Sequence, residues 1–359
     1  MKQLILSINI ALLIIVLNSC SNKESNQQST SQKNSANTGI NEEKLLAQAQ
    51  TVFKALPDYA ENPENEITPE KVALGKALYY DTHLSKNGNN SCNSCHNLAT
   101  YGVDNKANST GDAGKNGNRN SPTVLNAAFQ SMQFWDGRAK NVEEQAGMPI
   151  LNPVEMAIPD KAYLEKKLAG IKEYKELFHQ AFPGDKNPVT YDHLQNAIAA
   201  FERTLVTPSR FDSYLKGNLS SLTTEEKHGL QTFIETGCSS CHNGVAVGGT
   251  MLQRFGTTTD YLTFTKSSFK DEGRKNVTKL DNDSDYFKVA VLRNIEHTYP
   301  YFHDGSISSL KEAIAIMGKA QLNQSLNEEQ IASIEVFLKA LTGNVPASAL
   351  QEPKPITMR

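Results

Sequence analysis

The pattern Cys-x-x-Cys-His occurs twice in the sequence, and this repetition most constrains what the chain can fold into. One copy lies in "NSCNSCHNL" at residues 90–98 and the other in "TGCSSCHNG" at residues 236–244. The pattern is the attachment signature of c-type haem. Two thiols reach the vinyl groups of one porphyrin, and the adjacent histidine turns a ring nitrogen onto the iron. We therefore predict two covalently bound c-type haems.

Three other interpretations of the cysteines fit less well. A zinc ribbon usually has its CxxC pairs about 15–20 residues apart, whereas the two motif histidines lie 146 positions apart. A thioredoxin-like site needs one CxxC in a βαβ setting, and a plain disulfide leaves the histidines unexplained. The predicted attachment residues and proximal ligands are Cys92, Cys95 and His96 for the first haem and Cys238, Cys241 and His242 for the second.

The first forty residues differ in composition from the rest of the chain. After Lys2, an apolar run from Leu4 to Leu17 leads into "LNSC", which is typical of an export signal. We interpret residues 1–20 as a bacterial lipoprotein signal peptide, with Cys20 as the lipidated residue. An ordinary cleaved signal peptide is the alternative, and the run is short of the roughly 20 apolar residues of a membrane span. Residues 21–40 are almost wholly polar and predict a flexible tether.

The lipid anchor and the tether together predict a body held on the periplasmic side of a bacterial membrane. The 359-residue chain has a net charge of −3 and is 38% hydrophobic, which fits a soluble globular body and does not indicate nucleic-acid binding. There are five cysteines. If Cys20 carries lipid, the other four belong to the CxxCH motifs and none remains for a structural disulfide.

Met317 is the best candidate for a second axial ligand on the second haem. It lies in "SSLKEAIAIMGKAQ", where Ser309 and Glu312 have the spacing of a capping box that opens a helix. Leu310, Ile314 and Met317 then fall on one helix face. Core packing alone also explains a methionine on such a face, but His/Met ligation is what raises the potential of an electron-transfer haem.

Longer motifs link the chain to a known family. The segments "RNSPTVLNAAF", "FWDGRAKNVEEQA", "NPVEM", "FERTLVTPSRFDSYLKG" and "LRNIEHTYPYFHDGSISSLKEAIAIM" occur in this order. They resemble the bacterial di-haem cytochrome c peroxidases, a family that also holds the MauG-type oxygenases. The resemblance runs from about residue 44 to about residue 345. It implies a mainly α-helical fold, with two cytochrome c-like haem domains packed around a seam.

The resemblance also implies how the two haems divide the work. Residues 41–207 are expected to form an N-terminal peroxidatic domain and residues 208–345 a C-terminal electron-transfer domain, with a tail at 346–359. In the family, peroxide reacts at the low-potential N-terminal haem, and the C-terminal haem is a high-potential His/Met relay. Met317 matches the relay methionine. The helix predicted in "SLNEEQIASIEVFLKALTG" is a candidate to pack back on the first domain.

Three further residues match the catalytic residues of the family. Glu155 of "NPVEM" matches the acid–base carboxylate near the peroxidatic iron, and Gln145 of "EEQA" matches the glutamine beside it. A carboxylate is needed because peroxide must lose a proton from one oxygen and gain one on the oxygen that leaves. Trp135, the only tryptophan, matches the family residue between the two haems. Without the resemblance, a solvated glutamate and a core tryptophan would be the more ordinary interpretations.

A calcium ion between the domains is also implied. Its ligands in the family are one asparagine side chain and two backbone carbonyls, together with water, and the matching residues are Asn120, Thr298 and Pro300. Oxygen ligands of this kind suit a hard cation. A turn-forming asparagine next to an ordinary loop is the alternative.

The chain departs from many family members at one position. They carry a distal histidine seven residues before the arginine of "RNSP", where this chain has Asp112, and no histidine lies between His96 and His179. We therefore expect the first haem to have no histidine as sixth ligand and to react with peroxide without prior reduction. The rival is that His83 swings in as the ligand.

The implied reaction is the reduction of hydrogen peroxide to water, with electrons from a small redox protein such as a cytochrome c or a cupredoxin. A MauG-like oxygenase that modifies another protein is one alternative. That class has a distal tyrosine on the second haem, for which Tyr299 and Tyr301 are nearby candidates. The second alternative is a non-catalytic di-haem electron carrier. Such a carrier would need a sixth ligand on both irons. Homodimers are common in the family, so the resemblance implies a possible homodimer, but no motif of this sequence independently indicates one.

Overall fold

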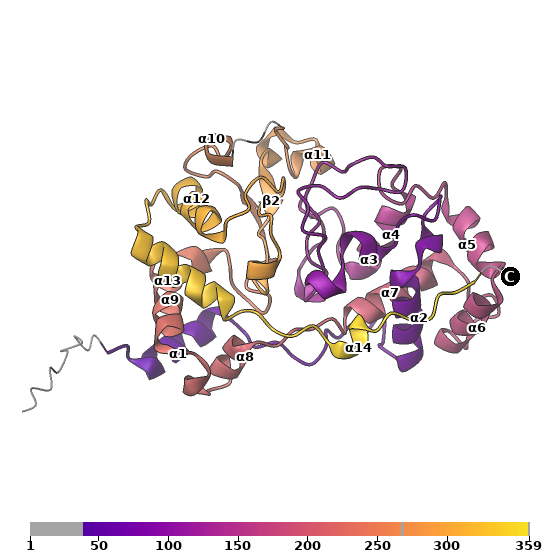
Figure 1. Cartoon of the computed structure of the whole chain (residues 1–359), viewed down its shortest axis with the longest axis horizontal. Coiled ribbons are helices and arrows are strands. Elements are labelled where there is room, and N and C mark those ends of the chain that lie inside the picture. The colour runs from indigo at the N-terminus through magenta and orange to yellow at the C-terminus, as the bar shows by residue number, and fades with distance from the viewer. Residues whose placement is uncertain (1–38, 266, 268, 358–359) are drawn as a thin grey trace, which may run out of the picture. The chain divides into compact units, whose positions relative to one another are not determined.

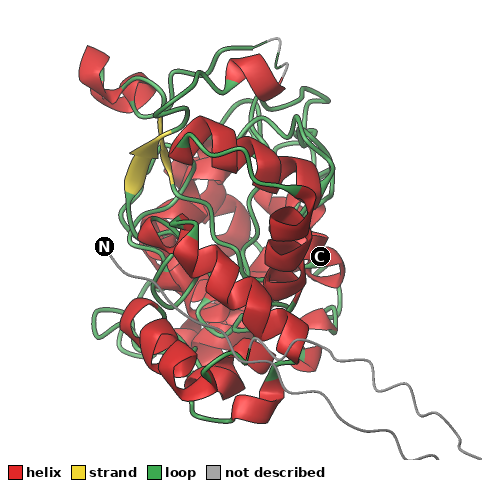
Figure 2. Cartoon of the chain, turned by 90° about the vertical axis from the view of Figure 1, so that its left-hand side faces the viewer, coloured by secondary structure: helices red, strands yellow, loops and turns green. Residues whose placement is uncertain are grey.

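The computed structural model describes residues 39–265, 267 and 269–357. These residues are mainly helical, as predicted, and Figure 2 shows one small pair of strands among the helices. The predicted signal peptide, Cys20 and nearly all of the tether lie outside the described residues. Within the described ranges, no helix is long and apolar enough to span a membrane.

The elements follow one another as short helices joined by long irregular segments. The α-helices are α1 (Glu42–Val52), α2 (Pro69–Tyr80), α3 (Cys92–Cys95), α4 (Val142–Leu151), α5 (Lys161–Ala169), α6 (Lys172–Ala181), α7 (Tyr191–Glu202), α8 (Arg210–Leu215), α9 (Thr224–Glu235), α10 (Leu262–Thr265), α11 (Lys275–Thr278), α12 (Leu310–Leu322), α13 (Glu328–Lys339) and α14 (Ala347–Leu350). The strands are β1 (Leu252–Arg254) and β2 (Tyr286–Lys288), and the 3₁₀-helices include η1 (Thr82–Leu84) and η5 (Cys238–Ser240).

A first core forms between α2 and the helices α4 to α7. Helix α2 begins where Thr68 accepts a hydrogen bond from the Lys71 N–H and Pro69 occupies the first turn, both of which favour helix initiation. Figure 1 shows α2 beside α7. A Cβ atom on Gly75 would overlap the backbone oxygen of Ala197, so the missing side chain of this glycine allows the two helices to approach closely.

A second core forms among α1, α8, α9, α12 and α13. Helix α9 begins at a capping box between Thr223 and Glu226. It packs along α13 (Figure 1), and a Cβ atom on Gly229 would overlap the backbone oxygen of Ser333. Each core therefore contains one helix pair held close by a glycine, and each CxxCH motif follows the first helix of its pair.

The first helix and the last segment each pack against the core formed by the other half of the sequence. Helix α1 packs against α8 and α9 in the second core. After α13, the chain returns to the first core, where Lys76 Nζ donates to the Ser348 carbonyl at 2.7 Å and the Tyr80 hydroxyl donates to the Ala349 carbonyl at 2.8 Å. Helix α13, the candidate to pack on the first domain, packs against α9 in the second core instead. The boundaries at residues 207 and 345 remain predictions.

The two strands form a small sheet whose second strand is hydrogen-bonded to the loop at residue 135. β1 pairs antiparallel with β2, with Leu252 opposite Lys288. The Lys288 N–H then donates to the Trp135 carbonyl at 2.7 Å. This bond fixes the end of β2 against the loop that carries the only tryptophan.

Candidate functional site

The first CxxCH motif lies on the wall of a cavity, which we call the first cavity. The single turn α3 begins at the Ser91 capping box, and His96 follows as its C-terminal cap. Cys92, Cys95 and His96 all line the first cavity, which encloses about 1480 Å³ of empty space, part of it open to solvent.

His96 is oriented as a metal ligand. Its Nδ1 lies 2.9 Å from the Pro122 carbonyl oxygen, so the neutral ring donates there and leaves Nε2 for an iron. Burial lowers the pKa of His96, which keeps the ring in the neutral form that binds metals. The residues present therefore fit a covalently attached haem.

The second CxxCH motif has the same arrangement in a second cavity. Cys238, Cys241 and His242 line this second cavity, which encloses about 1590 Å³ of empty space, part of it open to solvent. The Nδ1 atom of His242 lies 3.0 Å from the Ala290 carbonyl oxygen, and burial lowers the pKa of His242 to about 4. This histidine, too, is neutral with Nε2 available to a metal.

Met317 lies on α12 and lines the second cavity together with His242. The two tyrosines considered as alternatives are placed differently from one another. Tyr301 is buried and also lines the second cavity, whereas Tyr299 is 45% exposed. Met317 thus shares a cavity with the proximal histidine, which is what a second axial ligand requires.

A shared wall separates the two cavities. It includes Trp135, Asn120, Gln130 and Lys288, each of which lines both the first and the second cavity. The Trp135 indole N–H donates to the Asn120 carbonyl oxygen at 2.8 Å. The ring therefore has a fixed orientation in the wall between the two predicted haems.

Glu155 and Gln145 both line the first cavity. The Asn152 side chain donates to Glu155 Oε1 at 2.8 Å and fixes the carboxyl group. Burial raises the pKa of Glu155, although nearby Arg138 and the Asn152 hydrogen bond oppose the rise. A carboxyl group with a raised pKa exchanges protons nearer to neutral pH, as acid–base catalysis requires.

Asp112, at the position where the resemblance led us to look for a distal histidine, is buried and does not line the first cavity. Its carboxylate accepts the backbone N–H groups of Asn87 and Asn89 at 2.8 and 3.0 Å. Its own N–H donates to the Glu155 carbonyl at 2.7 Å. Burial alone would raise the pKa of Asp112, but these hydrogen bonds lower it below the ordinary value. The Asp112 side chain therefore stabilises the backbone turn at residues 87–89.

His83 does not line the first cavity either. Its Nδ1 lies 2.6 Å from Asp81 Oδ1 at the start of η1. Among the described residues, His96 is the only histidine that lines the first cavity. The open site at the first haem stays a prediction.

The three candidate calcium ligands belong to the lining of one cavity. Asn120, Thr298 and Pro300 all line the second cavity. The Asn120 side-chain N–H donates to the Lys106 carbonyl at 2.8 Å, which leaves the side-chain oxygen for a cation. Asn105 donates to two neighbouring carbonyl groups of the 297–300 loop, at 2.9 Å each, and so fixes that loop near Asn120.

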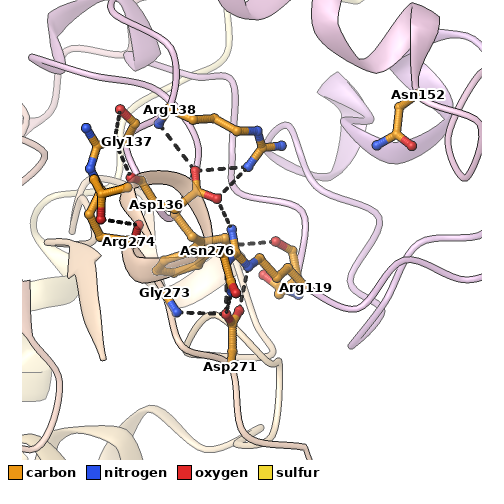
Figure 3. Close-up of polar contacts among 12 residues, drawn as sticks. Arg119, Asp136, Gly137, Arg138, Asn152, Asp271, Gly273, Arg274 and Asn276 are labelled. Atoms are coloured by element: carbon orange, nitrogen blue, oxygen red, sulfur yellow. Dashed lines mark hydrogen bonds and ion pairs between the residues drawn. The ribbon is translucent and has the colours of Figure 1, made fainter. Parts of the chain in front are cut away.

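Sequence reasoning missed an ion-pair network next to the shared wall (Figure 3). Arg119 donates to Asp271 Oδ2 at 2.5 Å and Oδ1 at 2.9 Å, and to Asp136 Oδ2 at 2.6 Å. Arg138 donates to both Asp136 oxygens at 2.9 and 3.0 Å, and its guanidinium lies 3.5 Å from the Phe134 ring centroid. "RNSP" and "FWDGR" contain four of these residues, but neither motif indicates Asp271.

Glu202 was also missed. It lines the first cavity at the end of α7 and is 4% exposed. Burial, with a contribution from Glu143, raises its pKa to about 8. A glutamate within the apolar run "AIAAFERTLV" was the available signal, because a charged residue flanked by core positions is buried for a reason.

Comparison with known proteins identifies the family of the chain. A profile described as di-haem cytochrome c peroxidase matches residues 69–220. The cytochrome c551 peroxidase of Nitrosomonas europaea is 46% identical, with 79% of this chain and 84% of that protein covered. The cytochrome c551 peroxidase of Pseudomonas aeruginosa is 43% identical, with 87% and 92% covered.

More distant similarities point to the same group. The methylamine utilization protein MauG of Methylorubrum extorquens is 34% identical, with 72% of this chain and 71% of that protein covered. The crystal structure of a MauG-like protein associated with microbial copper homeostasis has a TM-score of 0.74 at 26% identity, with 84% of this chain and 97% of that chain covered. The chain belongs to the di-haem cytochrome c peroxidase family.

Proposed function

We propose that the protein reduces hydrogen peroxide to water at the first cavity, with electrons that enter through the second. One observation carries the proposal: both cavities have a CxxCH motif, but only the first also has Glu155 and Gln145 on its wall. The relatives named cytochrome c551 peroxidase support the same activity.

Two covalently attached haems supply the one-electron redox chemistry of the iron, one in each cavity. Cys92, Cys95 and His96 would hold the first haem. Cys238, Cys241 and His242 would hold the second, with Met317 as its other axial ligand. His/Met ligation favours a high reduction potential, which suits a site that receives electrons from a donor.

Glu155 performs the proton transfer in this proposal. Its carboxylate accepts a proton from one oxygen of peroxide and returns it to the other, which leaves as water. Asn152 holds the carboxyl group through its 2.8 Å hydrogen bond. Gln145, on the same cavity wall, orients peroxide by hydrogen bonding. Trp135 lines both cavities, where its aromatic ring would assist electron transfer from the second site to the first.

In this proposal the first haem would have no histidine as sixth ligand in the resting protein. Support comes from Asp112 and His83, whose side chains bond to the backbone of Asn87 and Asn89 and to Asp81, respectively. Peroxide then reaches the site before any reduction. Met317 and Tyr301 both line the second cavity, and we assign the second axial position to Met317 because it matches the relay methionine of the family motif.

The first test is an EPR and optical spectrum of the fully oxidised protein, followed by stopped-flow mixing with peroxide. We expect a high-spin ferric signal that is lost on mixing, and steady-state peroxide consumption with a reduced small redox protein as donor. Two low-spin haems that do not react until one electron is added would refute the open site. Rapid loss of the signal without turnover by any donor would refute the peroxidase function.

A calcium ion and a lipid anchor complete the proposal. Asn120, Thr298 and Pro300 supply oxygen ligands to the calcium ion, and chelation followed by readdition of Ca²⁺ tests for a reversible loss of activity. Cys20 anchors the protein on the periplasmic side of a bacterial membrane. Metabolic labelling with a fatty acid, lost in Cys20→Ala, tests the anchor.

A further inference from the structure

Lys288 is a buried cation in the wall shared by the two cavities. It ends β2, is 6% exposed and lines both cavities. Its backbone N–H donates to the Trp135 carbonyl at 2.7 Å, and its Nζ donates to Gln130 Oε1. The ammonium group is thus held at one place in the wall.

Among the described residues, no carboxylate forms an ion pair with Lys288. Asp136 favours the charged form of the lysine through its field, but its oxygens are engaged by Arg119 and Arg138 at 2.6–3.0 Å. With the protein alone around it, burial lowers the pKa of Lys288 to about 7. A buried ammonium normally has an anionic partner, because desolvation without one is costly.

The other cations of the cavities have their partners. Arg119 and Arg138 line the first cavity, and both form ion pairs with Asp136. Of the described residues that line the second cavity, Lys288 is the only lysine or arginine. A haem carries two propionate carboxylates that need cationic partners. Among the described residues, Lys288 is the only lysine or arginine that lines both cavities, and it has no carboxylate partner in the protein.

We propose that Lys288 is the counter-ion of haem propionates at the wall between the two cavities, and that its charge raises the reduction potentials of both haems. The inference rests on the two-haem part of the proposed function. A fixed positive charge in a medium of low dielectric favours the haem with one more electron, so a lysine that faces both cavities acts on both potentials. Lys288 is a positioning residue, because it acts on peroxide chemistry only through the haems.

The experiment is a spectroelectrochemical titration of both haems in the di-haem protein, at about pH 6 and about pH 8, on either side of the pKa of about 7. The variants are Lys288→Met, which removes the charge, and Lys288→Arg, which keeps it. Lys311→Met is the matched control. It makes the same substitution at a lysine on α12 whose side chain is 59% exposed.

We expect Lys288→Met to lower both midpoint potentials at both pH values, while Lys288→Arg and Lys311→Met stay near the wild type. A propionate beside Lys288 holds its pKa well above 7, so the effect persists at the higher pH. A shift seen only at the lower pH would overturn the proposal, because the lysine would then have no anionic partner. Unchanged potentials, or a shift in one haem alone, would overturn it as well.

A second variant keeps the test usable if Lys288→Met does not fold. Gln130→Glu places a protein carboxylate against the ammonium and neutralises it without removing it. We expect both potentials to fall in this variant also, and unchanged potentials would contradict the proposal. The readout is independent of turnover, so a failed peroxidase assay with shifted potentials would count against the proposed function and not against Lys288.

Discussion

Arg119 and Asp271 form a bidentate ion pair across 152 positions of the sequence, with nitrogen–oxygen distances of 2.5 and 2.9 Å. The Asp271 side chain is 1% exposed and that of Arg119 15%. Asp271 also accepts the Gly273 N–H and the Asn276 side chain, both at 2.9 Å. The pair therefore fastens the loop before α11 to the "RNSP" segment beside the shared wall (Figure 3).

Asp271→Asn is predicted to destabilise the protein substantially. Removing one partner of a buried ion pair costs about 3–5 kcal/mol when the other charge is left uncompensated. The loss here should lie below that range, because Arg119 keeps its 2.6 Å contact with Asp136. Urea unfolding of the haem-loaded protein measures the loss. As a control, Lys172→Gln breaks the exposed pair with Glu176 and should cost about 0–1 kcal/mol. Equal losses in the two variants would show that the Arg119 pair is not a special contact.

The same pair predicts a loss of stability in acid. Burial alone would raise the pKa of Asp271, but the Arg119 hydrogen bond and charge lower it below the ordinary value. A carboxylate with a lowered folded-state pKa stabilises the fold above its unfolded pKa of about 4, and this contribution disappears as pH falls through the folded pKa. Unfolding free energies measured from neutral pH downward should fall less steeply in Asp271→Asn than in the wild type.

Glu155→Gln is predicted to lower peroxide turnover by about 100- to 10,000-fold, the usual contribution of a positioned acid–base group. Glutamine keeps the shape and the contact with Asn152, so the haem spectra should not change. Because burial raises the pKa of Glu155, its basic form increases with pH, and the wild-type rate should rise through that pKa while the variant rate stays flat. Glu144→Gln is the control, because Glu144 is an exposed glutamate on α4. Full activity in Glu155→Gln would exclude the assigned role.

Asp112→His is predicted to leave the first haem high-spin. The side chain at residue 112 faces the backbone of Asn87 and Asn89 rather than the first cavity, so a histidine introduced there is not directed at the iron. EPR of the oxidised protein measures the spin state, with Asp112→Asn as the near-isosteric control. A bis-histidine low-spin signal in Asp112→His would mean that the whole segment rearranges when a ligand is present.

Met317→His is predicted to lower the midpoint potential of the second haem and to leave that of the first unchanged. Methionine ligation raises the potential of a c-type haem relative to bis-histidine ligation. Redox titration followed in the visible spectrum measures it, and Met148→Leu, at a methionine that is 36% exposed, is the control. No change in Met317→His would mean that another group binds the second iron.

Much of the site could be predicted because its chemistry is local in sequence. The two CxxCH motifs fix which cysteines and histidines meet one haem, since five consecutive residues contain the whole attachment geometry. Helix α12 begins at Ser309, whose side chain accepts the Glu312 N–H, as the capping pattern predicted. Glu155, Gln145, Trp135 and Met317 were predicted through longer family motifs, and each lines a cavity with the expected histidine.

The rest depended on partners that are distant in sequence. The sequence determined two CxxCH haem attachment motifs, a mainly helical fold and the absence of any histidine between His96 and His179. Only the tertiary structure decided that Arg119 pairs with Asp271, that Asp112 turns away from the first cavity and that Lys288 faces both. A motif records what neighbouring residues do together, whereas the environment of a buried charge depends on segments more than a hundred residues away, which meet only when the cores pack.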